Sequence, residues 1–115
     1  MKPASKNILF GLLFIISIST LLPILGLTHF HTKGEPREAI VAVSMLEDGN
    51  WILPRNNGGD IAYKPPMYHW LTALGSMIFN RGDVNEYTSR LPSALAAIII
   101  ASTMFLFYSR RSGNY

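Results

Sequence analysis

The sequence predicts an all-α membrane protein, in which two transmembrane helices are joined by an external loop with two amphipathic surface helices. Three observations support this fold class. Two long, uncharged apolar runs lie towards the two ends of a chain of 115 residues. Charged residues make up only 15% of the chain, against about 25% in ordinary soluble domains. All 7 acidic residues lie between the two runs, so the apolar and polar parts of the chain are clearly separated.

The first apolar run covers residues 8–27. A helix of about 20 residues, rising about 1.5 Å per residue, crosses a hydrocarbon core of about 30 Å. Pro23 would kink such a helix, and membrane helices tolerate this. One alternative remains open, and a second is disfavoured. Lys2 and Lys6 precede the run, as in a cleaved signal peptide. A buried core helix would need more partner surface than a chain of this size offers.

The second run covers residues 91–108, with Pro92 expected in its first helical turn. Arg110 and Arg111 follow it, so both chain ends are basic. Short segments rich in Lys and Arg stay in the cytoplasm. We therefore expect cytoplasmic tails at 1–7 and 109–115, and a loop at 28–90 that faces the periplasm or the cell exterior.

Two surface helices are expected within this loop. Pro36 and Gly49 bracket the first, because proline suits a first turn and glycine suits the position after a last turn. Pro65 and Pro66 open the second, which runs to about Phe79. Each helix has apolar residues at three- and four-residue spacings, which predicts an apolar face: Ala39, Ile40, Val43 and Leu46 in the first, and Trp70, Leu71, Leu74, Met77 and Ile78 in the second. A short extended piece at 51–53 and a turn at 56–59 are expected between them.

The loop also contains the residues best suited to chemistry. Glu35 or Glu38 could act as a general base on an acceptor hydroxyl. Arg37 could bind a phosphate through two hydrogen bonds, and Lys64 could supply a point charge to it. The alternative is that the acid stabilises the start of a helix while the two basic side chains are merely solvated.

Other functional classes receive less support. The net charge of +3 is placed at the chain ends, which fits membrane topology better than a nucleic-acid surface. The chain has no cysteine, which excludes disulfides and cysteine-ligated metals. Three histidines could bind a metal but are better explained by structural roles: His29, His31 and His69. We predict no metal site and no cofactor from this segment.

The order of the motifs adds a resemblance. GEPRE at 34–38 is followed by WILP at 51–54, YKPP at 63–66 and SRLPSAL at 89–95. This order resembles the N-terminal portion of membrane glycosyltransferases of the GT-C type. Within them it is most similar to the aminoarabinose–lipid A transferase and dolichyl-phosphate-mannose protein mannosyltransferase-like group. The resemblance covers nearly the whole chain.

The resemblance implies an activity. Such enzymes move a sugar from a polyprenyl-phosphate donor to a lipid or protein hydroxyl, outside the bacterial inner membrane. Glu35 would match the second acid of the family's Asp-Glu pair, Arg37 its arginine, and Lys64 the lysine near the donor phosphate. Gly34 stands where many relatives have the catalytic Asp, so the role of the base is expected to fall on Glu35 or Glu38. Tyr63 stands where some relatives have a metal-binding Glu.

Family members have several hundred residues and many spans. The chain is therefore expected to be an N-terminal fragment of such a glycosyltransferase, inactive alone, with cell-envelope or lipopolysaccharide modification as the implied context. The alternatives are a small non-enzymatic two-span membrane protein, a vestigial truncated product, or a secreted peptide left after signal cleavage.

Overall fold

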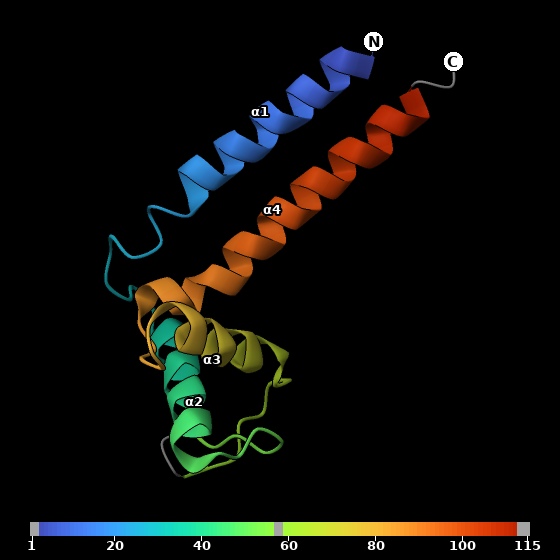
Figure 1. Cartoon of the computed structure of the whole chain (residues 1–115). Coiled ribbons are helices and arrows are strands. Elements are labelled where there is room, and N and C mark those ends of the chain that lie inside the picture. Colours follow the sequence, from blue (N-terminus) through green and yellow to red (C-terminus); the bar gives the residue numbers. More distant parts are fainter. Residues whose placement is uncertain (1–2, 57–58, 113–115) are drawn as a thin grey trace. The chain divides into compact units, whose positions relative to one another are not determined.

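The structure is a computed structural model that describes residues 3–56 and 59–112. The regular secondary structure of the described part is helical, apart from an isolated antiparallel bridge between Arg55 and Ile61, which agrees with the expected all-α class. The helices, shown in Figure 1, are α1 (Pro3–Leu21), α2 (Gly34–Asp48), α3 (Met67–Phe79) and α4 (Glu86–Arg111). The chain divides into two compact units: Met1–Ile24 with Ser93–Tyr115, and Leu25–Pro92.

The first unit pairs α1 with the C-terminal part of α4. The Lys6 ammonium donates a hydrogen bond to the Ser109 carbonyl at 2.6 Å, and the rings of Phe10 and Phe105 lie 6.0 Å apart. Both helices are long and apolar enough to cross a membrane. The apolar stretch of α1 has none of its residues buried inside the structure, which argues against a core helix of a soluble protein.

The bounds of these two helices differ from those of the apolar runs. α1 begins at Pro3 and ends at Leu21, short of residue 27, because Pro23 lacks an N–H donor and restricts the residue before it. α4 begins at Glu86, ahead of residue 91, so Pro92 lies inside the helix and not in its first turn.

The early start of α4 has a local cause. The Asn85 side-chain oxygen accepts a hydrogen bond from the Thr88 N–H at 2.9 Å. The Thr88 hydroxyl in turn accepts one from the Asn85 N–H at 3.0 Å. This reciprocal pair caps the helix, since it satisfies N–H groups that have no partner within the helix.

The second unit is built on the packing of α2 against α3. Both helices begin and end close to the expected positions. α2 ends at Asp48 and is followed by Gly49, whose φ of 66° is left-handed. The buried residues are mostly small: Ala39, Val41, Ala42, Ser44 and Met45 from α2, and His69, Thr72, Ala73, Gly75 and Ser76 from α3. Small side chains allow two helix backbones to approach closely.

The large apolar residues of α3 lie on the opposite side. All five members of its expected apolar face are exposed: Trp70, Leu71, Leu74, Met77 and Ile78. In α2 the expected face is only partly correct, because Ile40 is exposed while Ala42 and Met45 form the contact surface. A helix with small residues towards protein and large apolar residues outwards is typical of a lipid environment.

The segment between α2 and α3 folds back on itself. The Asn56 N–H donates to the Asp60 carbonyl at 2.8 Å, and the Ala62 N–H donates to the Pro54 carbonyl at 2.9 Å. The Gly59 N–H closes the expected turn by donating to the Asn56 carbonyl at 3.1 Å; residues 57 and 58 lie outside the described part. The piece at 51–53 is bent and not extended. This hairpin-like loop brings residues 60–64 close to α2.

Candidate functional site

A cavity of about 260 Å³ opens between the first two turns of α2 and the hairpin-like loop. Three of the four sequence-predicted site residues line it, namely Arg37, Glu38 and Lys64. The full lining is Gly34, Arg37, Glu38, Val41, Asn56, Asp60, Ile61, Ala62, Tyr63 and Lys64. The first turns of a helix have N–H groups without helical partners and a partial positive charge. The cavity is therefore suited to a ligand with a negatively charged group.

Glu38 is the best-connected residue of this cavity. One carboxylate oxygen accepts a hydrogen bond from the Lys64 ammonium at 2.6 Å, and the other lies 2.6 Å from Nε2 of His69. Partial burial works to raise the pKa of Glu38, but the hydrogen bonds from Lys64 and His69 outweigh it and leave the pKa below its ordinary value of 4.5. Glu38 is therefore an ionised carboxylate at neutral pH.

Lys64 and Arg37 supply the positive charge. The Lys64 side chain is 68% exposed although its ammonium contacts Glu38, so a ligand can reach it. Arg37 is exposed, and the described part of the chain offers it no ion-pair partner within 4.0 Å. A guanidinium from α2 and an ammonium from the hairpin-like loop, which line the same cavity, can bind a phosphate together, the first through its planar fork and the second as a point charge.

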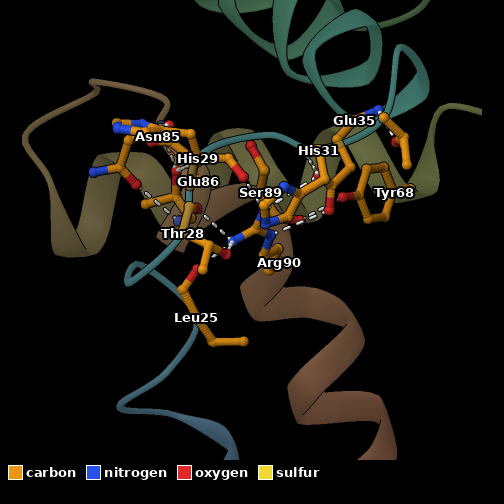
Figure 2. A network of polar contacts seen from close by, with 12 residues as sticks. Leu25, Thr28, His29, His31, Glu35, Tyr68, Asn85, Glu86, Ser89 and Arg90 are labelled. Atoms are coloured by element: carbon orange, nitrogen blue, oxygen red, sulfur yellow. Dashed lines mark hydrogen bonds and ion pairs between the residues drawn. The ribbon is translucent and has the colours of Figure 1, made fainter.

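Glu35 lies apart from the cavity lining, in a different network (Figure 2). Its two oxygens accept hydrogen bonds from Nε and Nη2 of Arg90 at 3.1 and 3.2 Å. The His31 backbone N–H also donates to it, at 3.3 Å. The Arg90 hydrogen bond is the largest influence on the Glu35 carboxyl, and it holds the pKa below 4.5. Glu35 therefore has a structural role, because it links the start of α2 to Arg90 of α4 and to the backbone at His31.

Arg90 lies within the SRLPSAL motif, and its role was not predicted. Besides Glu35, its guanidinium donates to the carbonyls of Leu25, Thr28 and His29 at 2.9, 2.9 and 3.1 Å. Its side chain is 18% exposed, and Figure 2 shows it at the centre of these groups. Arg90 therefore fastens the segment that follows α1, and the start of α2, to the first turns of α4. The pairing joins residues 55 positions apart, and no local pattern indicates it.

The three histidines take separate places. His29 is exposed beside Glu86, with 3.3 Å between Nδ1 and the carboxylate, and His31 is exposed. His69 is buried against Glu38, a position that was also missed. A signal for it exists in the sequence. His69, Thr72, Ala73 and Ser76 recur at helical spacing and form a polar, small stripe on an otherwise apolar helix, which marks the side that faces protein.

Comparison with known proteins gives partial relatives. The chain is 38% identical over 92 residues to the undecaprenyl phosphate-alpha-4-amino-4-deoxy-L-arabinose arabinosyl transferase of Shewanella sediminis, covering 78% of this chain and 16% of that protein. It is 36% identical over 85 residues to the protein of the same name from Pseudomonas savastanoi, covering 74% of this chain and 15% of that protein. An uncharacterized protein of Aquifex aeolicus is 32% identical over 74 residues, covering 64% of this chain and 17% of that protein.

The chain thus spans about one sixth of the length of the transferases that it matches, at 16% and 15%. No family model matches it. No solved structure matches it significantly. The chain is a partial homologue of proteins named as arabinosyl transferases.

Proposed function

We propose that this chain is the donor-phosphate-binding part of an integral membrane glycosyltransferase that uses a polyprenyl-phosphate sugar. The observation that supports this most directly is the cavity beside α2, where Arg37, Glu38 and Lys64 converge from two separate segments. The similarity to two arabinosyl transferases, whose names specify an undecaprenyl phosphate-linked sugar, points to the same class of donor.

In the proposed reaction, Arg37 and Lys64 bind the phosphate through which the sugar is attached to the lipid. The acceptor hydroxyl oxygen attacks the anomeric carbon, and the bond from this carbon to the phosphate oxygen breaks, with its electron pair leaving on the phosphate. Glu38 takes the proton from the hydroxyl. The two cations stabilise the negative charge that develops on the departing phosphate. Electrostatic stabilisation of this kind is usually the largest single contribution to catalysis.

Glu38 is a better candidate than Glu35 for the base. Both Glu35 oxygens are occupied by Arg90, whereas Glu38 lines the cavity. The Lys64 ammonium donates a hydrogen bond to Glu38. Its flexible side chain has three donor hydrogens, so it can turn towards an arriving phosphate while Glu38 becomes available to the acceptor. Glu35 would then contribute by positioning the start of α2.

The membrane context follows from the donor. A polyprenyl chain partitions into the bilayer, so its phosphate lies at the membrane surface, where a loop between two spans can reach it. We propose the bacterial inner membrane with the loop in the periplasm and both termini in the cytoplasm. The proposed acceptor is a lipid or protein hydroxyl of the cell envelope, with lipopolysaccharide modification as the favoured process. A small non-enzymatic two-span membrane protein is the competing function.

Binding of undecaprenyl phosphate to the chain in lipid nanodiscs tests the proposal. Undecaprenol has the same hydrocarbon chain without the phosphate, and it serves as the matched ligand. We expect at least tenfold tighter binding of the phosphate, because a hydrogen bond to a charged group contributes about 1.5–3 kcal/mol and about 1.4 kcal/mol corresponds to a factor of ten. Equal binding of the two lipids would support the non-enzymatic function instead.

Two substitutions connect this binding to the cavity. Lys64→Ala and Arg37→Ala should each weaken undecaprenyl phosphate binding by about tenfold. Lys33→Ala is the matched control, because Lys33 precedes α2 and does not line the cavity. A loss as large in the control would mean that general surface charge, and not the cavity, binds the phosphate.

A further inference from the structure

His69 is a buried imidazole between the two helices of the second unit. Only 1% of it is exposed, although histidine is usually at least partly solvated. It lies on the face of α3 that packs against α2, and its Nε2 atom is 2.6 Å from the Glu38 carboxylate. His69 does not line the cavity, while Glu38 does. His69 therefore contacts Glu38 on the side away from the cavity, where α2 packs against α3.

The direction of this hydrogen bond follows from its partner. An ionised carboxylate can only accept, so Nε2 of His69 carries the hydrogen and donates it. Within the described residues, Nδ1 of His69 is buried without a hydrogen-bond partner. Leaving a buried polar atom unsatisfied is costly, and most such atoms in native proteins have a partner. An apolar residue would fill this position without that cost, so packing alone does not explain a histidine here.

The other charged groups around Glu38 have different positions. Lys64 contacts the second carboxylate oxygen from the exposed side. Arg37 and Asp60 line the same cavity. The pKa of Tyr68 is raised mainly by burial and, to a smaller extent, by the negative charge of Glu38. Of these groups, only His69 contacts Glu38 from the buried side. The exposed Lys64 ammonium can leave Glu38 and contact a ligand instead. His69 is buried, so its contact with Glu38 cannot be replaced by one with a ligand.

We propose that His69 is a positioning residue for Glu38: its Nε2–H holds one carboxylate oxygen, so that the other oxygen faces the cavity. This inference rests on the proposed function, in which Glu38 accepts a proton from the sugar acceptor. A glutamate has several rotatable bonds, and a fixed second contact keeps its carboxylate in one orientation when Lys64 turns to the phosphate. The bond also stabilises the ionised form of Glu38 in the interval when the contact with Lys64 is lost.

A purely structural role for His69 predicts different behaviour. If His69 only filled space between α2 and α3, replacing it with a ring of similar shape would leave the Glu38 carboxyl titrating as before. If it positions Glu38, loss of the donor must change that titration, and another donor of equal reach must restore it. Glutamine provides such a donor, because its side-chain nitrogen is separated from Cβ by as many bonds as Nε2 of histidine.

The experiment is a carbon-13 NMR titration of the glutamate carboxyl groups, made on the full chain in micelles. Glu38 is assigned by comparison with Glu38→Gln. We expect His69→Phe to raise the pKa of Glu38 relative to the unmodified chain, and His69→Gln to bring it back towards the original position. The titration of Glu35 is the internal control, since its partner is Arg90 and it should not move.

Each outcome decides the proposal. An unchanged Glu38 titration in His69→Phe overturns it, as does a titration in His69→Gln that stays with that of His69→Phe. If His69→Phe fails to fold, the comparison of His69→Gln with His69→Leu replaces it, and equal titrations of Glu38 in these two variants overturn the proposal. Undecaprenyl phosphate binding to the unmodified chain is measured in parallel. Absent lipid binding in the unmodified chain would refute the proposed function and leave the NMR result interpretable.

Discussion

At the scale of single residues, the two acids at the start of α2 have different environments although they are close in sequence. Glu35 is bound by Arg90, while Glu38 lies between Lys64 and His69. Positions three apart in a helix point in similar directions, so the sequence does not distinguish the two acids. Only the partners brought in from α3, α4 and the hairpin-like loop separate a structural acid from one that lines a cavity.

Arg90→Ala should destabilise the second unit strongly. It removes the donor to Glu35 and to three backbone carbonyls, and a hydrogen bond to a charged group contributes about 1.5–3 kcal/mol. Arg90→Lys should recover little of this, because an ammonium cannot reproduce the planar fork. Thermal unfolding in micelles, followed by far-UV circular dichroism, measures both. Arg110→Ala is the control, and equal unfolding temperatures for the Arg90 and Arg110 variants would contradict the assigned role.

The two acids also predict a pH dependence. Because the folded-state pKa values of Glu35 and Glu38 lie below 4.5, the folded chain binds fewer protons than the unfolded chain near that pH. Their stabilisation is complete above about pH 4.5 and is lost as the pH falls through the folded-state values. We expect the unfolding temperature to drop in this acid range and to drop less steeply in Glu38→Gln. An unfolding temperature that rises on acidification would show that neither carboxylate is stabilised by its partners.

At the scale of elements, the helices were predictable where the cause is local. α2 and α3 were expected from proline, glycine and helical spacing, and the structure confirms both. The predicted start of α4 was wrong because it was placed at the start of the apolar run. The Asn85–Thr88 cap begins the helix earlier, at Glu86. The predicted end of α1 was also wrong, since Pro23 was expected to kink the helix, whereas the helix ends before it, at Leu21. For the candidate site, the sequence supplied Arg37, Glu38 and Lys64, whose roles stay proposals. The small, polar stripe of α3 marks the side of His69 that faces protein, but the partners of His69 and Arg90 lie 31 and 55 positions away and could not be predicted.

The interface of α2 and α3 should be sensitive to size. Ala42 and Ala73 are fully buried in the second unit, where the helices pack through small residues. Ala73→Leu adds volume that this interface cannot accept, and such overpacking costs about 1–3 kcal/mol. We expect a lower unfolding temperature and weaker undecaprenyl phosphate binding, because α2 forms one wall of the cavity. Leu74→Ala alters the exposed neighbour and should change the unfolding temperature much less; a larger effect there would mean that the exposed face carries the packing.

At the scale of the whole molecule, the two long helices and the outward-facing apolar side of α3 are explained together by a lipid environment. Large apolar side chains are exposed on all three, and water would disfavour so much apolar surface. The two helices alone satisfy only a length and composition criterion for crossing a membrane. Their orientation is a separate matter, which the charge distribution predicts and which labelling can test.

Single-cysteine labelling tests the orientation directly, because the chain has no cysteine of its own. Lys33→Cys places a thiol at an exposed position before α2, and Ser5→Cys places one near the start of α1. A membrane-impermeant maleimide added to intact spheroplasts should label Lys33→Cys and leave Ser5→Cys unlabelled until the membrane is permeabilised. Ser112→Cys, after α4, should behave like Ser5→Cys if both termini are cytoplasmic.

Labelling of all three from outside would exclude the two-span arrangement. Protection of Lys33→Cys with labelling of the other two would reverse the orientation and remove the cavity from the periplasmic side, where the proposed sugar transfer takes place.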